Sequence, residues 1–207
     1  ELDVRTIADV EAIEARPYDE LVTPRNIHDL FRATARHAGE RAALTVLRSP
    51  DPADIGLSLT HHGLLAEVTR AANLFRSLGL APGQGVAAFL SPTLPELPAL
   101  LLGAQVAGVA SSLNYLLSRE AIVDLLAAER TTILVVPSRA LDETCWTKAE
   151  GILADVPTLE RVLVMGGEGD LPAGHLRLDE ALARCRPDAL DFEPSQDRDA
   201  VCALFHT

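Results

Sequence analysis

The last residues of the chain have the clearest chemical potential. Ala200–Phe205 is an apolar run typical of a buried strand, and it leads directly into His206 and Thr207. A strand that ends in a small hydroxyl residue can carry the backbone into a loop whose N–H groups bind an anion such as phosphate. Because many ordinary strands also end in threonine, this pattern alone does not identify a phosphate site. Thr207 is the candidate binding residue of the chain.

A glycine cluster, Gly166–Asp170, follows another predicted strand. A dinucleotide-binding loop needs three spaced glycines that open a helix, whereas the residues after Asp170 have the composition of a loop. We therefore interpret the cluster as an exposed turn. The sequence also lacks a Walker loop and the Gly-x-Ser-x-Gly elbow of serine hydrolases.

The histidines and acidic pairs do not form a metal or acid–base pattern. His61–His62 lies near a predicted helix start, where adjacent side chains point to different faces and make a poor metal pair. The acidic pairs Asp142–Glu143 and Asp179–Glu180 also fall at predicted helix starts. Carboxylates there complement the helix dipole, so we expect capping roles and no metal site.

The composition argues against a nucleic-acid partner and favours a reducing compartment. The 207 residues are 48% hydrophobic and carry a formal net charge of −12, whereas proteins that bind a phosphate backbone show a basic surface. No secretory signal is visible, and the cysteines, which form no CxxC pair, are Cys145, Cys185 and Cys202. We therefore expect a cytoplasmic protein with buried, unreactive thiols.

One uncharged stretch, Leu97–Ser118, nominally reaches the length of a membrane span. Polar residues and Pro98 interrupt it, and no Lys/Arg cluster flanks it. We expect a buried helix followed by a buried strand here, and no membrane span.

Strands alternate with helices along most of the chain. Apolar runs between turn residues predict strands at 42–47, 57–60, 86–90, 109–113, 131–136, 161–165 and 200–205. The segments between them predict six helices. The first begins after Asn26, the second covers 63–78, and the third runs from a Thr93/Glu96 capping box to Ala107. The fourth begins after Ser118, and the last two cover about 140–154 and 179–185.

This alternation predicts an α/β fold with a mainly parallel sheet and helices on both faces. The early strands at 42–47 and 57–60 should form a peripheral antiparallel pair. Residues 1–25 are polar and weakly periodic, so we expect a peripheral N-terminal segment before one α/β subdomain over 26–207.

Five segments, taken in order, resemble one known family. One of them closely resembles a Leu-Gly-x-x-Pro-Gly-Asp-x-Val turn, here with Gln84 for Asp. Another resembles an Ala-x-x-Ala-Gly-x-x-x-x-Pro-x-Asn segment, here with Ser112 for Pro. The segments are Asn26–Leu47, Leu59–Leu64, Leu78–Val86, Leu102–Asn114 and Asp199–Thr207. They resemble the adenylate-forming (AMP-binding) superfamily, and the segment ending at Asn114 is more similar to acyl- or aryl-CoA ligases than to peptide-synthetase domains.

The resemblance implies the N-terminal part of an ATP-dependent acyl-CoA synthetase, cut at the start of its phosphate loop. Such enzymes convert a small carboxylic acid and ATP into an acyl-adenylate, with Mg²⁺ stabilising the leaving pyrophosphate, and then form a thioester with CoA. The resemblance places the catalytic residues after position 207. Thr207 carries over as the first phosphate-loop residue, and we expect this chain alone to bind no cofactor and to be inactive.

Two other hypotheses stay open on the sequence. One is a self-contained α/β binding or regulatory module without catalysis. The other is a different nucleotide enzyme, such as a reductase, which would need the glycine fingerprint that is absent. A truncated subdomain should expose an apolar face around Leu204 and Phe205 and self-associate through it, whereas a self-contained module should not.

Overall fold

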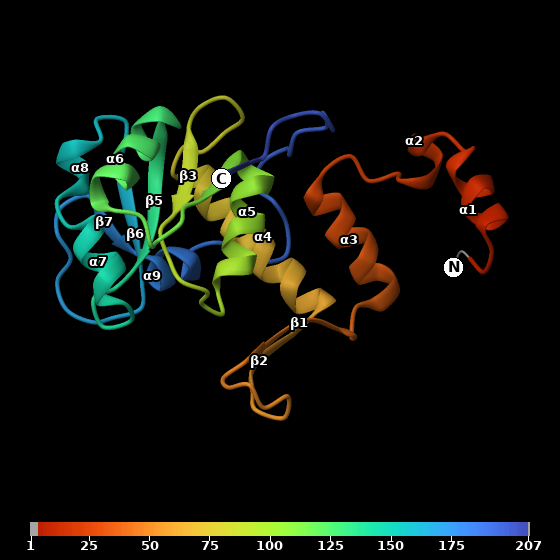
Figure 1. The fold of residues 1–207 in the computed structure, drawn as a ribbon, viewed down its shortest axis with the longest axis horizontal. Coiled ribbons are helices and arrows are strands. Elements are labelled where there is room, and N and C mark those ends of the chain that lie inside the picture. Colours follow the sequence, from red (N-terminus) through yellow and green to blue (C-terminus); the bar gives the residue numbers. More distant parts are fainter. Residues whose placement is uncertain (1–3, 207) are drawn as a thin grey trace.

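The computed structural model of this chain describes residues 4–206 and contains one large and one small sheet (Figure 1). The strands are β1 (Ala42–Leu47), β2 (Ile55–Thr60), β3 (Val86–Phe89), β4 (Val109–Ser112), β5 (Thr131–Pro137), β6 (Arg161–Met165), β7 (His175–Arg177) and β8 (Ala203–Phe205). The helices are α1 (Ile7–Glu14), α2 (Tyr18–Leu21), α3 (Ile27–Ala38), α4 (His61–Ser77), α5 (Leu97–Ala107), α6 (Arg119–Ala128), α7 (Glu143–Ala149), α8 (Ile152–Asp155) and α9 (Leu178–Ala183).

The large sheet has six strands in the order β7-β6-β5-β3-β4-β8, and every neighbouring pair is parallel. Strands β1 and β2 pair antiparallel and project from the body as a separate hairpin (Figure 1). The predicted strands at 86–90, 109–113, 131–136, 161–165 and 200–205 therefore belong to one sheet. The expected fold class is confirmed, including the antiparallel pair.

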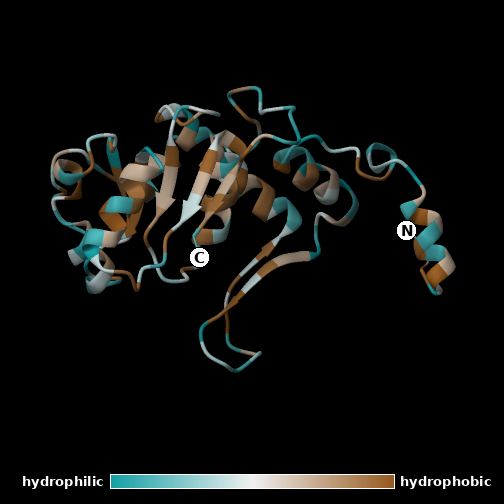
Figure 2. Ribbon diagram, turned by 45° about the horizontal axis from the view of Figure 1, so that its top comes forward, coloured by the Kyte–Doolittle hydropathy of each residue, from teal (hydrophilic) through white to brown (hydrophobic). Residues whose placement is uncertain are grey.

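Side-chain alternation along the strands builds a core on each face of the sheet. On β3, Ala87 and Phe89 face a cluster that includes residues of α4, α5 and α9, whereas Ala88 faces a cluster with α6, α7 and α8. A strand covered on both faces must be apolar throughout, and β5 is buried at almost every position. Figure 2 shows the same concentration of hydrophobic residues in the strands and the helices beside them.

The helix pair α4 and α5 packs closely because small residues line the contact. A methyl group added at Gly103 on α5 would lie 2.5 Å from Cβ of Ala71 on α4. Helix α3 packs on the outer side of α4. In this contact, the Nε2–H of buried His28 donates to Oγ1 of Thr69 over 3.0 Å. The Thr69 hydroxyl itself donates to the Leu65 carbonyl, which leaves its lone pairs for His28.

The N-terminal segment forms an arm that lies away from the sheet (Figure 1). A capping box between Thr6 and Asp9 stabilises the N-terminus of helix α1, but no residue of this helix is buried. Sequence reasoning did not predict α1 or α2, because the apolar residues of α1 are weakly periodic and α2 is only four residues long. The division of the chain at residues 25 and 26 stays a prediction.

Several elements differ from the sequence-based ones, and four differences are informative. Helix α5 begins at Leu97, not at a Thr93 cap, because a separate turn precedes it and Glu96 makes no side-chain capping bond. The predicted helix at 140–154 is two short helices, since Gly151 adopts a left-handed conformation with φ 70° between them. Strand β7 was missed, and the last strand is shorter because its first residues form a turn.

Within residues 4–206, no helix combines the length and the apolar character needed to cross a membrane. The uncharged stretch after Leu97 instead forms α5 and β4, as expected.

Candidate functional site

The carboxyl ends of the parallel strands define the candidate site. In an open α/β sheet, ligands bind beyond these ends, close to the point where the strand order reverses direction. Here the chain moves from β3 to β4 in one direction and then passes back over β3 to β5. The reversal therefore lies between β3 and β5, and the loops after these strands begin at Leu90 and Ser138.

Strand β8 returns to this sheet beside β4. Ala203, Leu204 and Phe205 pair with Ala110, Ser111 and Ser112, so β8 ends at the same edge as the other strands. The candidate residue Thr207 comes two positions after β8 and lies outside the described residues. The structure thus places the chain leading to Thr207 at the carboxyl edge, and the role of Thr207 stays a prediction.

The connector between α9 and β8 is held on α4 by Asn73. This buried side chain donates from Nδ2 to the carbonyls of Arg186 and Ala189 over 3.1 and 2.8 Å, and its Oδ1 accepts from the Asp191 amide over 2.8 Å. The amide therefore uses both of its donors and its acceptor on one segment. The ring of Phe192 packs under the Arg76 guanidinium at 4.1 Å from its centroid, which continues the same attachment.

A buried carboxylate lies beneath the end of β8. The side chain of Glu129, between α6 and β5, is only 5% exposed. Its Oε1 accepts a hydrogen bond from Oγ of Ser111 over 2.6 Å and pairs with Nε2 of His206. Its Oε2 accepts from the Thr131 hydroxyl over 3.4 Å. We call Ser111, Glu129, Thr131 and His206 the Glu129 network.

The Glu129 network contains Ser, His and Glu but lacks the geometry of a nucleophilic triad. In a triad the histidine removes the serine proton, and the carboxylate binds the other ring nitrogen. Here Ser111 donates directly to Glu129, and Nε2 of His206 contacts both Ser111, at 3.3 Å, and Glu129. A carboxylate can only accept, so Nε2 carries the proton and cannot act as a base toward Ser111. Ser111 is also fully buried.

Sequence reasoning singled out the end of the last strand, with Thr207 as the candidate, but it gave His206 no role and missed Glu129 and Ser111. These residues are far apart in the chain, and each has an ordinary local context: a helix end and a strand interior. The only local signal is the left-handed Arg130, with φ 58°, and that conformation cannot be read from an arginine in a sequence.

The glycine cluster after β6 forms a turn, as expected, and opens no helix. Gly166, Gly167 and Gly169 all have positive φ, and Arg177 donates to the carbonyls of Gly167 and Gly169. The turn borders a cavity of about 350 Å³ that includes Ser138 and Trp146. Because the cation of Arg177 is engaged by backbone carbonyls, the turn does not present it as an anion-binding group.

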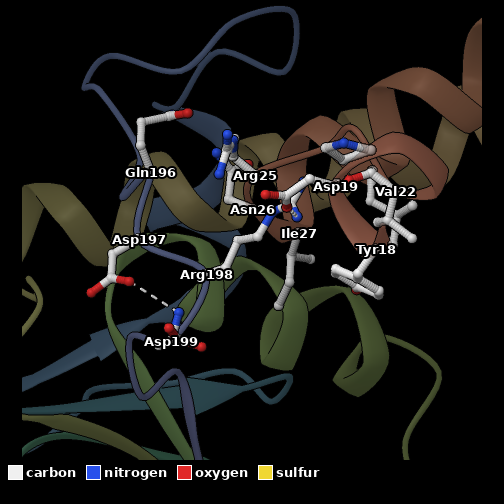
Figure 3. A pocket seen from close by; sticks show the side chains of 12 residues that line it. Tyr18, Asp19, Val22, Arg25, Asn26, Ile27, Gln196, Asp197, Arg198 and Asp199 are labelled. Carbon is white, nitrogen blue, oxygen red and sulfur yellow. Dashed lines mark hydrogen bonds and ion pairs between the residues drawn. The ribbon is translucent and has the colours of Figure 1, made fainter. Parts of the chain in front are cut away.

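A cavity of about 650 Å³ lies between the N-terminal arm and the connector (Figure 3). Arg198 reaches across it from the connector to Asp19 and to the Val22 carbonyl, and its guanidinium lies 5.4 Å from the Tyr18 ring centroid. Sequence reasoning did not predict this cavity. Through these contacts Arg198 attaches the arm to the body.

The remaining candidates have structural roles. His62 Nδ1 pairs with Glu40 over 3.0 Å, and Asp142 caps α7 by accepting from the Cys145 amide. Across residues 4–206, no group of three or more His, Cys, Asp or Glu residues could hold a metal ion.

The cysteines differ in their environments. Burial, aided by Asp142, raises the pKa of the Cys145 thiol to about 12, so this thiol stays protonated. Burial also raises the pKa of Cys185, with Asp191 adding to the effect. The expectation of full burial is correct for Cys145 and wrong for Cys185 and Cys202, which are partly exposed.

Comparison with protein families decides the assignment. The model of the AMP-binding enzyme family matches residues 31–207. The chain belongs to this family. The match covers both sheets and runs through β8, so the resemblance found in the sequence is confirmed.

Three relatives illustrate the relationship. The chain is 30% identical to marinolic acid–CoA ligase of Pseudoalteromonas sp. (strain SANK 73390) over 146 residues, which are 70% of the chain and 22% of that ligase. It is 33% identical to human long-chain fatty acid transport protein 1 over 179 residues, 86% of the chain and 26% of that protein. The crystal structure of an acyl-CoA synthetase from Brucella canis shares the fold, with a TM-score of 0.68, 20% identity, and coverage of 88% of this chain and 31% of that one.

The chain therefore spans about a quarter to a third of the length of these relatives.

Proposed function

We propose that this chain is the N-terminal part of an ATP-dependent acyl-CoA synthetase. The whole protein would join a small carboxylic acid to AMP, release pyrophosphate, and pass the acyl group to CoA. The observation that carries the proposal is the family match through residue 207, together with a β8 that ends at the carboxyl edge of a parallel sheet. We also propose a cytoplasmic location, because cysteines without a CxxC pair or a disulfide pattern are typical of a reducing compartment.

The role proposed for this chain is to deliver and support the segment that binds phosphate. We propose that the groups that contact the triphosphate and Mg²⁺ lie beyond the described residues, among which no group of three or more His, Cys, Asp or Glu residues could hold a metal ion. Mg²⁺, when bound, would neutralise charge on the leaving pyrophosphate. Within this chain, Asn73 fixes the path of the connector and β4 fixes the direction of β8. Thr207 follows as the proposed first residue of the phosphate-binding loop.

An exchange assay tests the proposed chemistry. The longer parental protein should incorporate labelled pyrophosphate into ATP only when a carboxylic acid is present, and should form an acyl-CoA when CoA is added. A panel of short, long and aromatic acids would define the substrate. A parental protein that shows neither activity with any of these acids contradicts the proposed function.

The chain of residues 1–207 is the matched control. We expect no carboxylate-dependent exchange from it, because the groups that contact ATP would follow Thr207. Exchange above background by this chain would place the chemistry within residues 1–207 instead.

We further propose that the chain by itself associates through the free edge of β8. Among the described residues, β8 pairs only with β4, Phe205 is 77% exposed, and nearby Val201 is 64% exposed. An exposed apolar edge strand invites pairing with another chain. Sedimentation velocity should show association that Phe205→Ser weakens, whereas Ile55→Ser on the distant β1–β2 hairpin should leave it unchanged. A chain that is monomeric at all accessible concentrations contradicts this proposal.

A further inference from the structure

The Glu129 network joins three parts of the chain that meet only at the edge of the sheet. Ser111 belongs to β4, Glu129 follows α6, and His206 follows β8. Ser111 and His206 each place a polar atom against the carboxylate of Glu129, which is almost fully buried. Removing a carboxylate from water is costly unless hydrogen bonds satisfy it, so this arrangement holds all its members in place.

Strand β8 needs such an attachment because little else in the chain holds it. It is three residues long, lies at the edge of the sheet, and leaves Phe205 largely exposed. Ser111 pairs in register with Leu204, so Ser111 and His206 lie on the same face of the sheet. The side chain of His206 can therefore reach back to Glu129 while its backbone continues past the end of the strand.

The bonding pattern requires a specific state of His206. Because Ser111 donates its own proton to Glu129, the Nε2–H of His206 must point toward both the carboxylate and the Ser111 oxygen. One imidazole orientation satisfies both acceptors. That orientation fixes the side chain of the residue directly before Thr207.

We propose that Glu129 acts through His206 as a positioning residue, which fixes the direction in which the chain leaves β8 toward the phosphate-binding segment. The proposal rests on the proposed function, because it assigns the segment after His206 to ATP. It makes Glu129 and His206 positioning residues that do not touch the reacting atoms, and it predicts an effect on ATP use that exceeds any effect on the carboxylic acid.

The first experiment measures the attachment itself and does not depend on ATP. Amide hydrogen exchange of residues 203–206 would be followed by NMR in the 207-residue chain. Glu129→Gln keeps the shape but removes the charge, and His206→Phe keeps a ring but removes the donor. Each should speed exchange at these amides by about tenfold, the change typical of losing one buried hydrogen bond to a charged group. Exchange in β3 should be unchanged.

Asp124→Asn is the matched control, because Asp124 is an exposed carboxylate on the adjoining helix α6. It should leave exchange at residues 203–206 unchanged. If Glu129→Gln and His206→Phe behave like Asp124→Asn, the attachment does not exist and the proposal is wrong, whatever the parental protein does.

The second experiment uses the parental protein and separates positioning from stability. In Glu129→Gln and His206→Phe we expect the KM for ATP in the exchange reaction to rise by about tenfold or more, as small displacements at a reacting centre do. The KM for the carboxylic acid should change much less. His206→Gln retains a donor and should recover part of the loss.

The two experiments fail in different ways. Faster exchange at residues 203–206 together with an unchanged KM for ATP would show a purely structural network and overturn the positioning role. A parental protein without exchange activity in its unsubstituted form would contradict the proposed function, while the amide-exchange result would still decide whether Glu129 holds the end of β8.

Discussion

The strands β5 and β8 belong to the same sheet but are held in different ways. Strand β5 has seven residues, pairs on both sides, and is covered by a hydrophobic cluster on each face. Strand β8 has three residues, pairs on one side, and relies on hydrogen bonds made by Asn73 and Glu129 to the segments around it. The centre is fixed by packing, whereas the edge where the proposed chemistry begins is fixed by a few polar contacts.

The strongest test of this comparison replaces a large side chain by alanine in each of the two regions and compares the losses in the free energy of unfolding. Phe75 is completely buried and meets Phe89 edge-on at 5.9 Å between ring centroids. Phe75→Ala should lower the free energy of unfolding by about 3–5 kcal/mol, because it removes apolar burial and leaves a cavity. Urea unfolding measures the change. Phe205→Ala at the edge is the control, and a comparable loss there would contradict the distinction between centre and edge.

A second test asks how tightly the helices over the centre are packed. Gly103→Ala would place a methyl group 2.5 Å from Ala71 Cβ and 2.8 Å from the Ala72 amide nitrogen, so we expect a loss of about 1–3 kcal/mol. Gly63→Ala on α4 meets its neighbours at 3.6 Å or more. That substitution should be neutral or stabilise by up to about 1 kcal/mol, since alanine favours a helix. Equal effects of the two changes would mean that the α4–α5 contact can relax.

We expect a smaller effect of pH on stability, through His28 at the contact between α3 and α4. Burial lowers the pKa of His28, and the nearby Arg32 lowers it further, while Asp29 opposes the shift. The unfolded chain then takes up this proton at a higher pH than the folded chain, so the stability that His28 contributes is lost as pH falls below about 6.5. Thermal unfolding between pH 7 and 5 should show a shallower decline for His28→Gln than for the unsubstituted chain.

His37→Gln is the control, because it removes a histidine at an exposed position of the same helix. A profile for His28→Gln that follows the unsubstituted chain would show that His28 is protonated equally in both states.

The smallest effect is expected from removing the end of the arm. Helix α1 buries no residue, and deleting residues 1–15 should change the free energy of unfolding by less than about 0.5 kcal/mol. The deletion keeps Tyr18, Asp19 and Val22, which contact Arg198. A larger loss would mean that the N-terminal segment belongs to the folded subdomain and would move the predicted boundary at residue 25.

The predictable part of the fold is the part governed by local pattern. Ser118 caps α6 and Asn26 caps α3 as their side chains suggest, because a cap depends only on residues within one turn. Apolar runs located the strands of the sheet, since burial on both faces demands them. The Thr93 cap failed because the Leu94–Leu97 turn, which ends where α5 begins, was not recognised.

The site was less predictable, for a physical reason. The end of the last strand was singled out by its place after an apolar run, but the partners of His206 depend on which strands become neighbours. Local sequence patterns do not reveal that β8 returns beside β4, which brings Ser111 and Glu129 to His206. The Asn73 contacts were missed likewise, because they join α4 to a connector more than a hundred residues later.

The pairing of β8 with β4 also bears on the order in which the protein is made. Ala110 leaves the ribosome about 90 residues before its partner Ala203, an interval of roughly 5–20 seconds at ordinary rates of synthesis. Throughout that time the outer edge of β4 has no neighbour from its own chain. A nascent chain would present this open edge after β3, β4 and β5 have assembled, so a chaperone or a second nascent chain could pair with it there.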